Sequence, residues 1–448
     1  MTLLKELEQK DAAESGRALY SFAADLYPIC RSITGQGIRE TLDRIARKIP
    51  LRRTSVPTGT QVFDWTIPKE WNIRDAYIKS SKSERVVDFR RSNLHVVNYS
   101  APVHKIMTMN ELGPHLFSAP ETPGWIPYRT SYYQENWGFC LSHNQLLELQ
   151  KDGGTFEVCV DSTLEDGNLT YGECYLSGHS TDEVLISAHV CHPSLANDNL
   201  SGLTVAVALA ELLAGRDLRY SYRFLFIPAT IGAIAWLANN QKDAHRIRHG
   251  LVLTCIGDSA DFHYKKSRQG SAEIDRAVAE VFRHLGEPSD IIEFSPYGYD
   301  ERQYCSPGFN LPVGCLMRSV WGTFPEYHTS ADNLDFIRPE KLEQSLRLCA
   351  AIFDVLEGNQ RYCNLSPFCE PQLGRRNLYR GSGRGGVEDE TLARLWVLNL
   401  SDGKHSLLDI AERSGQSFAA IRVAAELLRQ SGLLSVVAEV TSLKTGVS

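Results

Sequence analysis

The sequence predicts an α/β fold whose central sheet is of parallel type and is covered by helices on both faces. Three strand-like runs, at residues 183–190, 222–228 and 250–257, consist mostly of apolar residues, as buried parallel strands do. Apolar helical stretches at 202–213 and 231–239 separate these runs. Strands that alternate with helices along a chain favour this layered arrangement.

Helices are also predicted ahead of this region. Apolar residues recur at roughly helical spacing over residues 3–28, and a turn at 31–37 that contains two glycines ends that helix. A second helix is expected at about 38–48. We assign residues 1–55 and 171–370 to one α/β core.

Between residues 56 and 170 the pattern changes to that of a separate β-rich module. Short β-like runs occur at 86–89 and 94–99, and prolines and aromatic residues cluster at 120–128. We therefore predict a β-rich domain inserted into the core.

The C-terminal part of the chain reads as a small helical domain. A Gly/Arg-rich stretch at 374–386 is expected to be a linker or loop. Helices are expected at 388–399, 405–413 and 416–431. A β-like pair at 432–437 follows them, so we predict a winged-helix-like domain at 385–442.

Charge argues against a nucleic-acid partner. The net charge is −7, from 54 acidic and 47 basic residues, which disfavours a broad phosphate-binding surface. The third C-terminal helix carries Arg422 and Arg429 but also Glu426. We expect the winged helix to serve interdomain packing or homo-oligomer formation rather than DNA binding.

Composition also predicts the compartment. No run approaches 18 apolar residues, and the N-terminus lacks the features of a signal peptide. The eleven cysteines contain no CxxC pair, which gives little support to a zinc ribbon or a redox dithiol. We expect a cytoplasmic protein with reduced thiols and no membrane partner.

The segment 189–202 carries the strongest chemical signal. It follows an apolar strand and precedes an apolar helix, which places His189 and Asp198 at the C-terminal edge of the sheet. Open α/β sheets hold their sites at this edge. Imidazole and carboxylate are ligands suited to zinc, and Asp198 could bridge two ions.

Two further candidates follow later in the chain. Asp258 comes at the end of the predicted strand 250–257, and His328 lies four residues before Asp332, which could orient a histidine. Simpler interpretations stay open, because Asp198 could be a helix N-cap and Asp258 a turn residue.

These motifs, in this order, resemble the di-zinc exopeptidases typified by bacterial leucyl aminopeptidases. Nearly the whole chain is similar to a bacterial family of aminopeptidase-like proteins, often linked to polysaccharide or secondary-metabolite gene clusters. That family joins a zinc-exopeptidase core, a mixed sheet flanked by helices, to an inserted β-rich domain and a C-terminal winged helix. Further matching stretches are 30–35, 63–65, 70–76, 92–95, 127–133, 137–143, 161–167 and 300–307.

The resemblance implies one or two zinc ions. His189 and Asp258 would hold one ion together with a bridging Asp198, and His328 with Asp198 would hold the second. Such a metal lowers the pKa of a bound water and polarises the scissile carbonyl. A glutamate after the strand 222–228 would act as the general base.

The sequence departs from the family at that base. It reads Pro-Ala-Thr-Ile-Gly around Ala229, where the family typically has Pro-Glu-Thr-Ile-Gly. Alanine takes no proton and binds no metal. We consider an engineered inactivating substitution, a natural loss of activity, or a base relocated to Glu326, Glu301 or His192, and we favour the first.

Other charged residues are candidates for substrate binding. Arg31 and Arg129 could hold a substrate carboxylate by bidentate contact, although structural pairing explains them equally well. Asp300, Arg302 and Tyr304 are expected to line the pocket, with a structural ion-pair network as the alternative.

Together these observations predict a zinc-dependent, aminopeptidase-like amidohydrolase that acts on a small peptide or amino-acid conjugate in a biosynthetic pathway. Ala229 would impair it. The alternative is a non-catalytic ligand-binding protein with a degenerate peptidase core.

Overall fold

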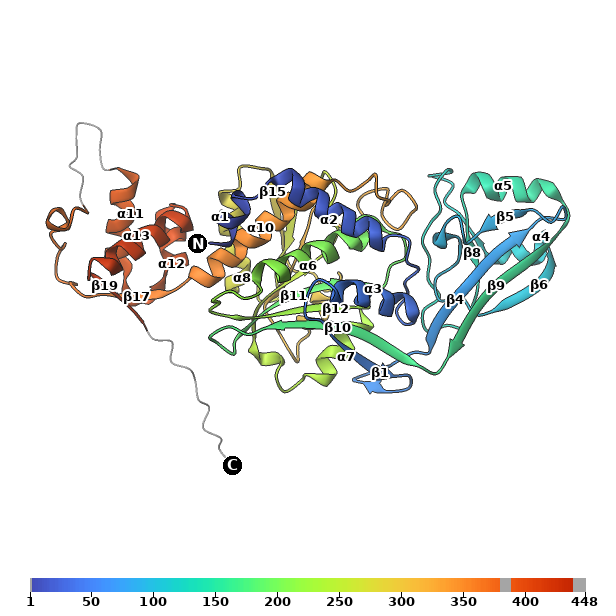
Figure 1. Ribbon diagram of the computed structural model, residues 1–448, viewed down its shortest axis with the longest axis horizontal. Coiled ribbons are helices and arrows are strands. Elements are labelled where there is room, and N and C mark those ends of the chain that lie inside the picture. Colours follow the sequence, from blue (N-terminus) through green and yellow to red (C-terminus); the bar gives the residue numbers. More distant parts are fainter. Residues whose placement is uncertain (1, 379–387, 438–448) are drawn as a thin grey trace, which may run out of the picture. The chain divides into compact units, whose positions relative to one another are not determined.

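The computed structural model describes residues 2–378 and 388–437, and the chain falls into two compact units (Figure 1). The first unit comprises Met1–Asp275 and Glu287–Ala350, and the second comprises Arg276–Gly286 and Ala351–Ser448. Within the described ranges, no helix is long and apolar enough to cross a membrane.

An eight-stranded mixed sheet forms the centre of the first unit. Its strands are β1 (Arg52–Pro57), β10 (Asn168–Leu176), β11 (Glu183–His189), β12 (Ser221–Ile227), β13 (Ile247–Leu253), β14 (Phe262–Lys265), β15 (Ser289–Ile292) and β16 (Val313–Met317). Their order is β1-β10-β12-β11-β13-β16-β14-β15. The four central strands β12, β11, β13 and β16 are parallel. Strand β10 is antiparallel to both of its neighbours, and β14 is antiparallel to β16 but parallel to β15. The expected α/β fold with a mixed sheet is confirmed.

Helices flank this sheet. They are α1 (Leu3–Glu8), α2 (Ala12–Leu26), α3 (Gln36–Ala46), α6 (Gly202–Leu213), α7 (Ile231–Asn239) and α9 (Glu301–Tyr304). Helices α8 (Glu273–Arg283) and α10 (Pro339–Gly358) begin in the first unit and continue into the second. The bounds of α6 and α7 are those that hydropathy predicts. The single helix predicted over 3–28 is wrong, because Asp11 caps a new helix there by accepting from the Ala13 backbone N–H at 2.9 Å.

Strand β13 ends earlier than the sequence predicts. The apolar run continues to residue 257, but the strand stops at Leu253. Cys255 has a φ of +47°, a left-handed conformation that extended strands do not contain. Asp258 therefore lies in the loop beyond the strand rather than at its end.

The β-rich residues inserted between β1 and β10 build small sheets of their own. Their elements are β2 (Gln61–Val62), β3 (Trp65–Thr66), β4 (Glu70–Lys79), β5 (Arg85–Asp88), β6 (Val103–Thr108), α4 (Met109–Leu112), β7 (Leu116–Phe117), β8 (Phe139–Cys140), α5 (His143–Asp152) and β9 (Thr155–Glu165). The strands pair as β5-β4-β9-β6, β2-β3 and β7-β8. The run 94–99 is not a strand, because it begins as a 3-10 turn at Asn93–His95 and then makes only isolated bridges. The domain bounds 56–170 stay a prediction.

The second unit contains three helices and a small sheet. These are α11 (Asp389–Leu400), α12 (Leu407–Ser414), α13 (Phe418–Gln430), β17 (Arg361–Asn364), β18 (Asp402–Ser406) and β19 (Leu434–Val436). The sheet order is β18-β17-β19. A 3-10 turn at Leu373–Arg376 begins the expected linker, and its continuation over 379–387 lies outside the described residues.

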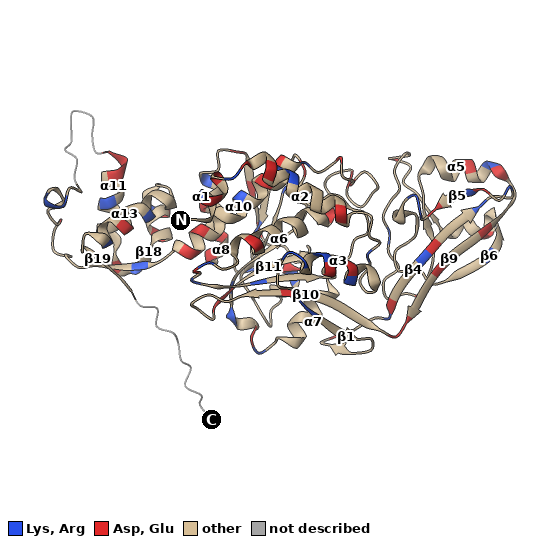
Figure 2. Ribbon diagram, in the orientation of Figure 1, with Lys and Arg blue, Asp and Glu red and all other residues tan. Residues whose placement is uncertain are grey.

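The arginines of α13 are engaged within their own unit. Arg429 makes two hydrogen bonds to the Glu426 carboxylate, and Arg422 donates to the backbone carbonyl of Asp354. Lys and Arg are interspersed with Asp and Glu over the described elements (Figure 2). The expectation that the winged helix does not bind DNA stays a prediction.

Candidate metal centre

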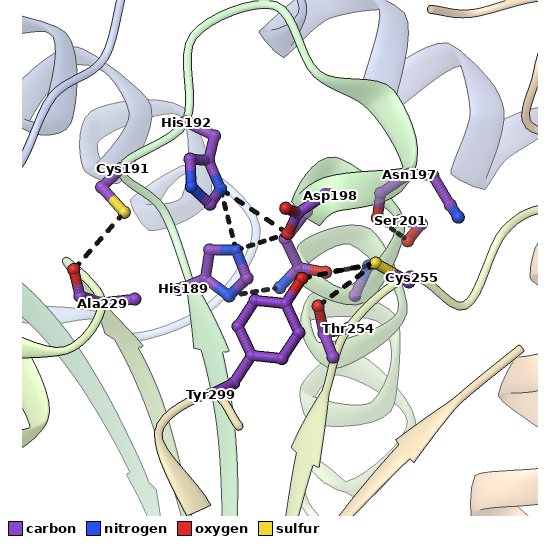
Figure 3. Close-up of polar contacts among 12 residues, drawn as sticks. His189, Cys191, His192, Asn197, Asp198, Ser201, Ala229, Thr254, Cys255 and Tyr299 are labelled. Carbon is purple, nitrogen blue, oxygen red and sulfur yellow. Dashed lines mark hydrogen bonds and ion pairs between the residues drawn. The ribbon is translucent and has the colours of Figure 1, made fainter. Parts of the chain in front are cut away.

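Three ligand atoms converge at the C-terminal end of β11 (Figure 3). Nε2 of His189 lies 2.8 Å from Oδ1 of Asp198 and 3.0 Å from Nδ1 of His192. All three atoms lie within 4.8 Å of one another. Two imidazoles and one carboxylate form a donor set that suits zinc.

His328 approaches the same aspartate from its other oxygen. Nε2 of His328 lies 3.0 Å from Oδ2 of Asp198, so this carboxylate has histidines on both oxygens. Burial alone would raise the pKa of Asp198, but His192 and His189 hold it well below its usual value. Burial lowers the pKa of His192 and of His328. An ionised carboxylate and neutral imidazoles are the forms that bind metals.

The backbone that carries Asp198 is fixed by another buried carboxylate. Oδ2 of Asp332 accepts from the Asp198 N–H at 3.0 Å, and Oδ1 accepts from the N–H of Asn197 at 2.6 Å. Asp332 therefore positions the loop that precedes α6. Both contacts are to backbone N–H groups, so they do not bear out the expectation that Asp332 orients a histidine side chain.

Two tyrosine rings stack on the histidines. The ring of Tyr299 lies 5.0 Å from that of His189 at an interplanar angle of 17°, and Tyr327 lies 4.0 Å from His328 at 13°. The Tyr299 hydroxyl donates to the Tyr327 hydroxyl at 3.2 Å. This pair restricts how either imidazole can rotate.

A third tyrosine comes from the inserted region. The ring of Tyr128 packs edge-on against His192 at 5.2 Å and against His328 at 5.1 Å. Its backbone N–H donates to the His328 carbonyl at 2.7 Å, beside an isolated bridge between Pro127 and Thr329. The insert is thus part of the walls of the site.

Asp258 stands apart from this group. Its Oδ2 accepts from Asn197 Nδ2 at 2.6 Å, and its Oδ1 accepts from Ser319 Oγ at 2.9 Å and from the Ala260 N–H at 2.8 Å. The structure therefore gives Asp258 the role of bracing Asn197. His192 takes the third place in the group, and its spacing of three residues from His189 was the available sequence signal.

The strand ends on either side of His189 carry no metal-binding side chain. Ala229 follows β12, and the Cys191 thiol lies 3.9 Å from its carbonyl oxygen. The buried Thr254 follows β13. Within the described residues, the group of His189, His192 and Asp198 is the one convergence of three such side chains. This group could hold a metal ion.

The two glutamates proposed as relocated bases are differently placed. Oε1 of Glu301 lies 2.9 Å from Nζ of Lys265, and both side chains are buried. A buried ion pair of this kind holds the carboxylate in place. Glu326 is half-buried two residues before His328, and its carbonyl accepts from the Thr329 N–H.

The two arginines proposed to bind substrate make other contacts. Arg31 is buried, and its Nε donates to the His192 carbonyl at 2.8 Å while one terminal nitrogen donates to the Leu26 carbonyl. Arg31 thus positions the backbone of His192. The Arg129 guanidinium lies over the Phe117 ring at 4.8 Å.

The remaining pocket candidates lie around α9. Both carboxylate oxygens of Asp300 are buried and have no hydrogen-bond partner in the described part of the chain, and burial raises its pKa to about 8. The Tyr304 hydroxyl lies 3.0 Å from Ser187 Oγ, beneath His189 on β11. The Arg302 guanidinium lies 5.9 Å from the Tyr297 ring.

Sequence comparison assigns most of this chain to one family. The family described as Domain of unknown function (DUF4910) matches residues 20–359. The chain belongs to the DUF4910 family. A second description, winged helix-turn-helix, matches residues 360–436 and confirms the expected C-terminal fold.

A curated relative and a solved structure, both from Clostridium acetobutylicum, are similar to this chain over nearly its whole length. One is 50% identical over 429 residues, covering 96% of this chain and 98% of the relative, and is named for polysaccharide biosynthesis with an aminopeptidase-like domain. The other is a crystal structure described as a peptidase, with 48% identity and a TM-score of 0.92 over 97% of this chain and all of the other.

More distant structures share the fold. A zinc aminopeptidase from Bacillus subtilis gives a TM-score of 0.53 at 13% identity, covering 75% of this chain and 94% of the other. A Peptidase M28 precursor from Shewanella amazonensis gives 0.53 at 14%, covering 79% and 96%. The resemblance of this DUF4910 chain to zinc aminopeptidases is therefore confirmed for the fold.

Proposed function

We propose that this DUF4910 site binds one zinc ion and belongs to an amide-bond hydrolase. The observation that carries the proposal is the convergence of His189, His192 and Asp198 within 4.8 Å. These three side chains would hold the ion, and His328 would secure the second oxygen of Asp198. When bound, zinc supplies an activated water and polarises a carbonyl.

The protein supplies a dry, rigid wall on one side and an opening on the other. The side chains of His189 and Asp198 are fully buried, whereas the His328 side chain is 34% exposed. A substrate would therefore approach past His328. Tyr128 and Tyr327 flank that approach and fix the plane of the imidazole.

Position 229 limits catalysis in this chain. The methyl group of Ala229 cannot hold or move a proton at the strand end beside Cys191. Loss of a general base typically costs about 10²–10⁴-fold in rate. We therefore propose that the site is intact for metal binding and impaired for turnover.

The fold and one relative's name support a substrate class, and the free thiols support a cellular compartment. The zinc aminopeptidase fold supports a small peptide or an amino-acid conjugate as substrate, and the name of the 50% identical relative supports a biosynthetic setting. All eleven cysteines are free thiols, as expected in a reducing compartment such as the cytoplasm.

The same observation at Ala229 favours one alternative. A peptidase core without its base could serve as a ligand-binding protein that performs no hydrolysis. Both proposals predict zinc at His189, and they differ in what a restored carboxylate would do.

The test compares the chain with Ala229→Glu and, as a control of similar size without a carboxylate, Ala229→Gln. Metal content and hydrolysis of a panel of aminoacyl and peptidyl amides are measured for each. We expect one zinc per chain in all three and turnover at least about 10²-fold higher in Ala229→Glu alone. Bound zinc without turnover in any form would instead support the binding protein, and absence of zinc would refute both.

A further inference from the structure

Two pairs of aromatic rings, Phe63 with Phe309 and Trp65 with Tyr133, meet at the β2–β3 hairpin of the first unit, and we call these four residues the aromatic rim. Phe63, Trp65 and Tyr133 are 45%, 43% and 47% exposed. Trp65 and Tyr133 have ring centroids 5.3 Å apart, and Phe63 and Phe309 have centroids 5.8 Å apart. Exposed large rings that gather in this way mark an interaction surface more often than isolated ones do.

The chain holds the rim in a defined conformation. Phe63 and Trp65 come from the tight β2–β3 hairpin, where the Gln61 amide donates to the Phe63 carbonyl and the Thr66 hydroxyl donates to Gln61. Phe63 has a φ of +55°, a left-handed conformation that bulky residues rarely adopt. The hairpin thus presents its rings at a conformational cost that other contacts must offset.

A series of tyrosines links the rim to the candidate metal centre. Tyr133 follows Tyr132, whose hydroxyl lies 3.0 Å from that of Tyr128, the ring that contacts two of the site histidines. Tyr133 is also close enough to Cys191 for the two groups to interact electrostatically, and burial raises its pKa. Cys191 is also the neighbour of Ala229. A ligand part on the rim would therefore extend away from the metal along this path.

The side chains around the rings decide what kind of ligand fits. Asp64 stands between Phe63 and Trp65, and Gln134 and Glu135 follow Tyr133, all of them exposed. A pyranose ring presents an apolar C–H face to an aromatic ring and hydroxyl groups at its edge, which match carboxylates and amides. A purely apolar partner would leave these three polar side chains to be desolvated without hydrogen bonds.

We propose that the aromatic rim binds a sugar that is joined through an amide to the group cleaved at the metal centre. The position of the amide in this ligand rests on the proposed hydrolytic function, because the amide is the bond that would be cleaved. Binding of the sugar itself requires only the rim. The substrate class would then be an aminoacylated or peptidylated amino sugar.

The first experiment measures binding of N-acetylglucosamine to the full chain by saturation-transfer NMR. Variants are Trp65→Ala and Tyr133→Ala, with Trp65→Phe as the conservative change and Phe368→Ala as a control, because Phe368 is 92% exposed and lies outside the rim. We expect binding about tenfold weaker in each rim alanine variant. Trp65→Phe and Phe368→Ala should bind like the parent chain.

The outcomes separate this proposal from the hydrolytic one. Absence of N-acetylglucosamine binding, equal binding by all variants, or binding of phenylalanine amide at the rim in place of the sugar would overturn the rim proposal, whatever the zinc content. Sugar binding that depends on Trp65, together with an inactive Ala229→Glu, would leave the rim proposal standing and refute hydrolysis. If Ala229→Glu is active, Trp65→Ala should lower kcat/KM for N-alanylglucosamine about tenfold and leave alanine amide unaffected.

Discussion

The two carboxylate oxygens of Asp198 have different numbers of histidine neighbours. On the Oδ1 side, His189 and His192 bring two nitrogens to within 3.6 Å of that oxygen. On the Oδ2 side, His328 is the one neighbouring imidazole among the described contacts. The proposal of a single zinc ion rests on this difference, because His189, His192 and Asp198 converge on one side only.

The largest effect expected from this comparison is on metal content. His189→Ala removes one of three donors from a buried group, so we expect the protein to lose its zinc after dialysis. Asp258→Asn removes a carboxylate that braces Asn197 and lies outside the group, so about one zinc per chain should remain. Elemental analysis of both variants decides this. Equal loss of zinc in the two variants would mean that Asp258 is a metal ligand, and the difference drawn between the two sides of Asp198 would be wrong.

The next effect is on zinc affinity, through Tyr128, whose ring contacts histidines on both sides of Asp198. Tyr128 contacts His192 on one side and His328 on the other, so Tyr128→Ala should free both rings. Residues that orient metal ligands typically contribute about 10–100-fold in metal affinity. We expect that loss in a competition titration with a zinc chelator. Tyr128→Phe keeps the ring and should stay within a few-fold of the parent chain, and a comparable loss there would assign the effect to the hydroxyl instead.

A smaller effect is expected in the pH dependence of stability. The pKa of Asp300 rises from 3.8 to about 8 in the folded protein because burial disfavours its charge. The folded state therefore binds the proton more tightly, so this group's contribution is fully present below pH 3.8 and is lost as the pH rises to about 8. Asp300→Asn stays neutral throughout.

Thermal unfolding between pH 4 and pH 8 tests this expectation. The advantage of Asp300→Asn over the parent chain should grow with pH and reach a few °C, because the shift in Tm per kcal/mol becomes smaller as a domain becomes larger. Parallel curves for the two proteins would show that Asp300 is ionised or paired in the folded state.

The smallest effect expected is on stability, from a hydrogen bond to Asp258, the residue that contacts Asn197. Ser319→Ala removes one hydrogen bond to Asp258 and should cost about 1 kcal/mol of stability. Zinc content should stay unchanged, because the variant touches none of the converging donors. Chemical denaturation together with elemental analysis measures both quantities, and loss of zinc here would mean that Asp258 acts on the metal after all.

Part of the site could be predicted because the segments that flank His189 and Asp198 have clear hydropathy patterns. His189 and Asp198 lie between an apolar strand and an apolar helix, and both patterns are visible in the sequence. The position of Asp258 was misjudged because Cys255 and Ile256 prolong the apolar run, while the left-handed backbone at Cys255 ends the strand. Hydropathy does not report a change of φ.

Other parts of the site could not be predicted from local pattern. His192 precedes a proline and looks like part of a turn, whereas in the structure Arg31 donates to its carbonyl and its ring lies beside His189. Tyr128 lies about 200 residues before His328, and no periodicity links the two. The aromatic rim depends likewise on bringing a hairpin of the insert beside a loop of the core.

The contact between Tyr128 and the His328 loop also sets an order of events during synthesis. The insert leaves the ribosome while the segment that carries His328 is still untranslated, so Tyr128 waits for a partner about 200 residues away. Contacts this distant in sequence slow folding, and multidomain chains fold from the N-terminal side during translation. The insert should therefore fold first, and the contact between Tyr128 and the His328 loop should form only after the segment around residue 328 has been synthesised.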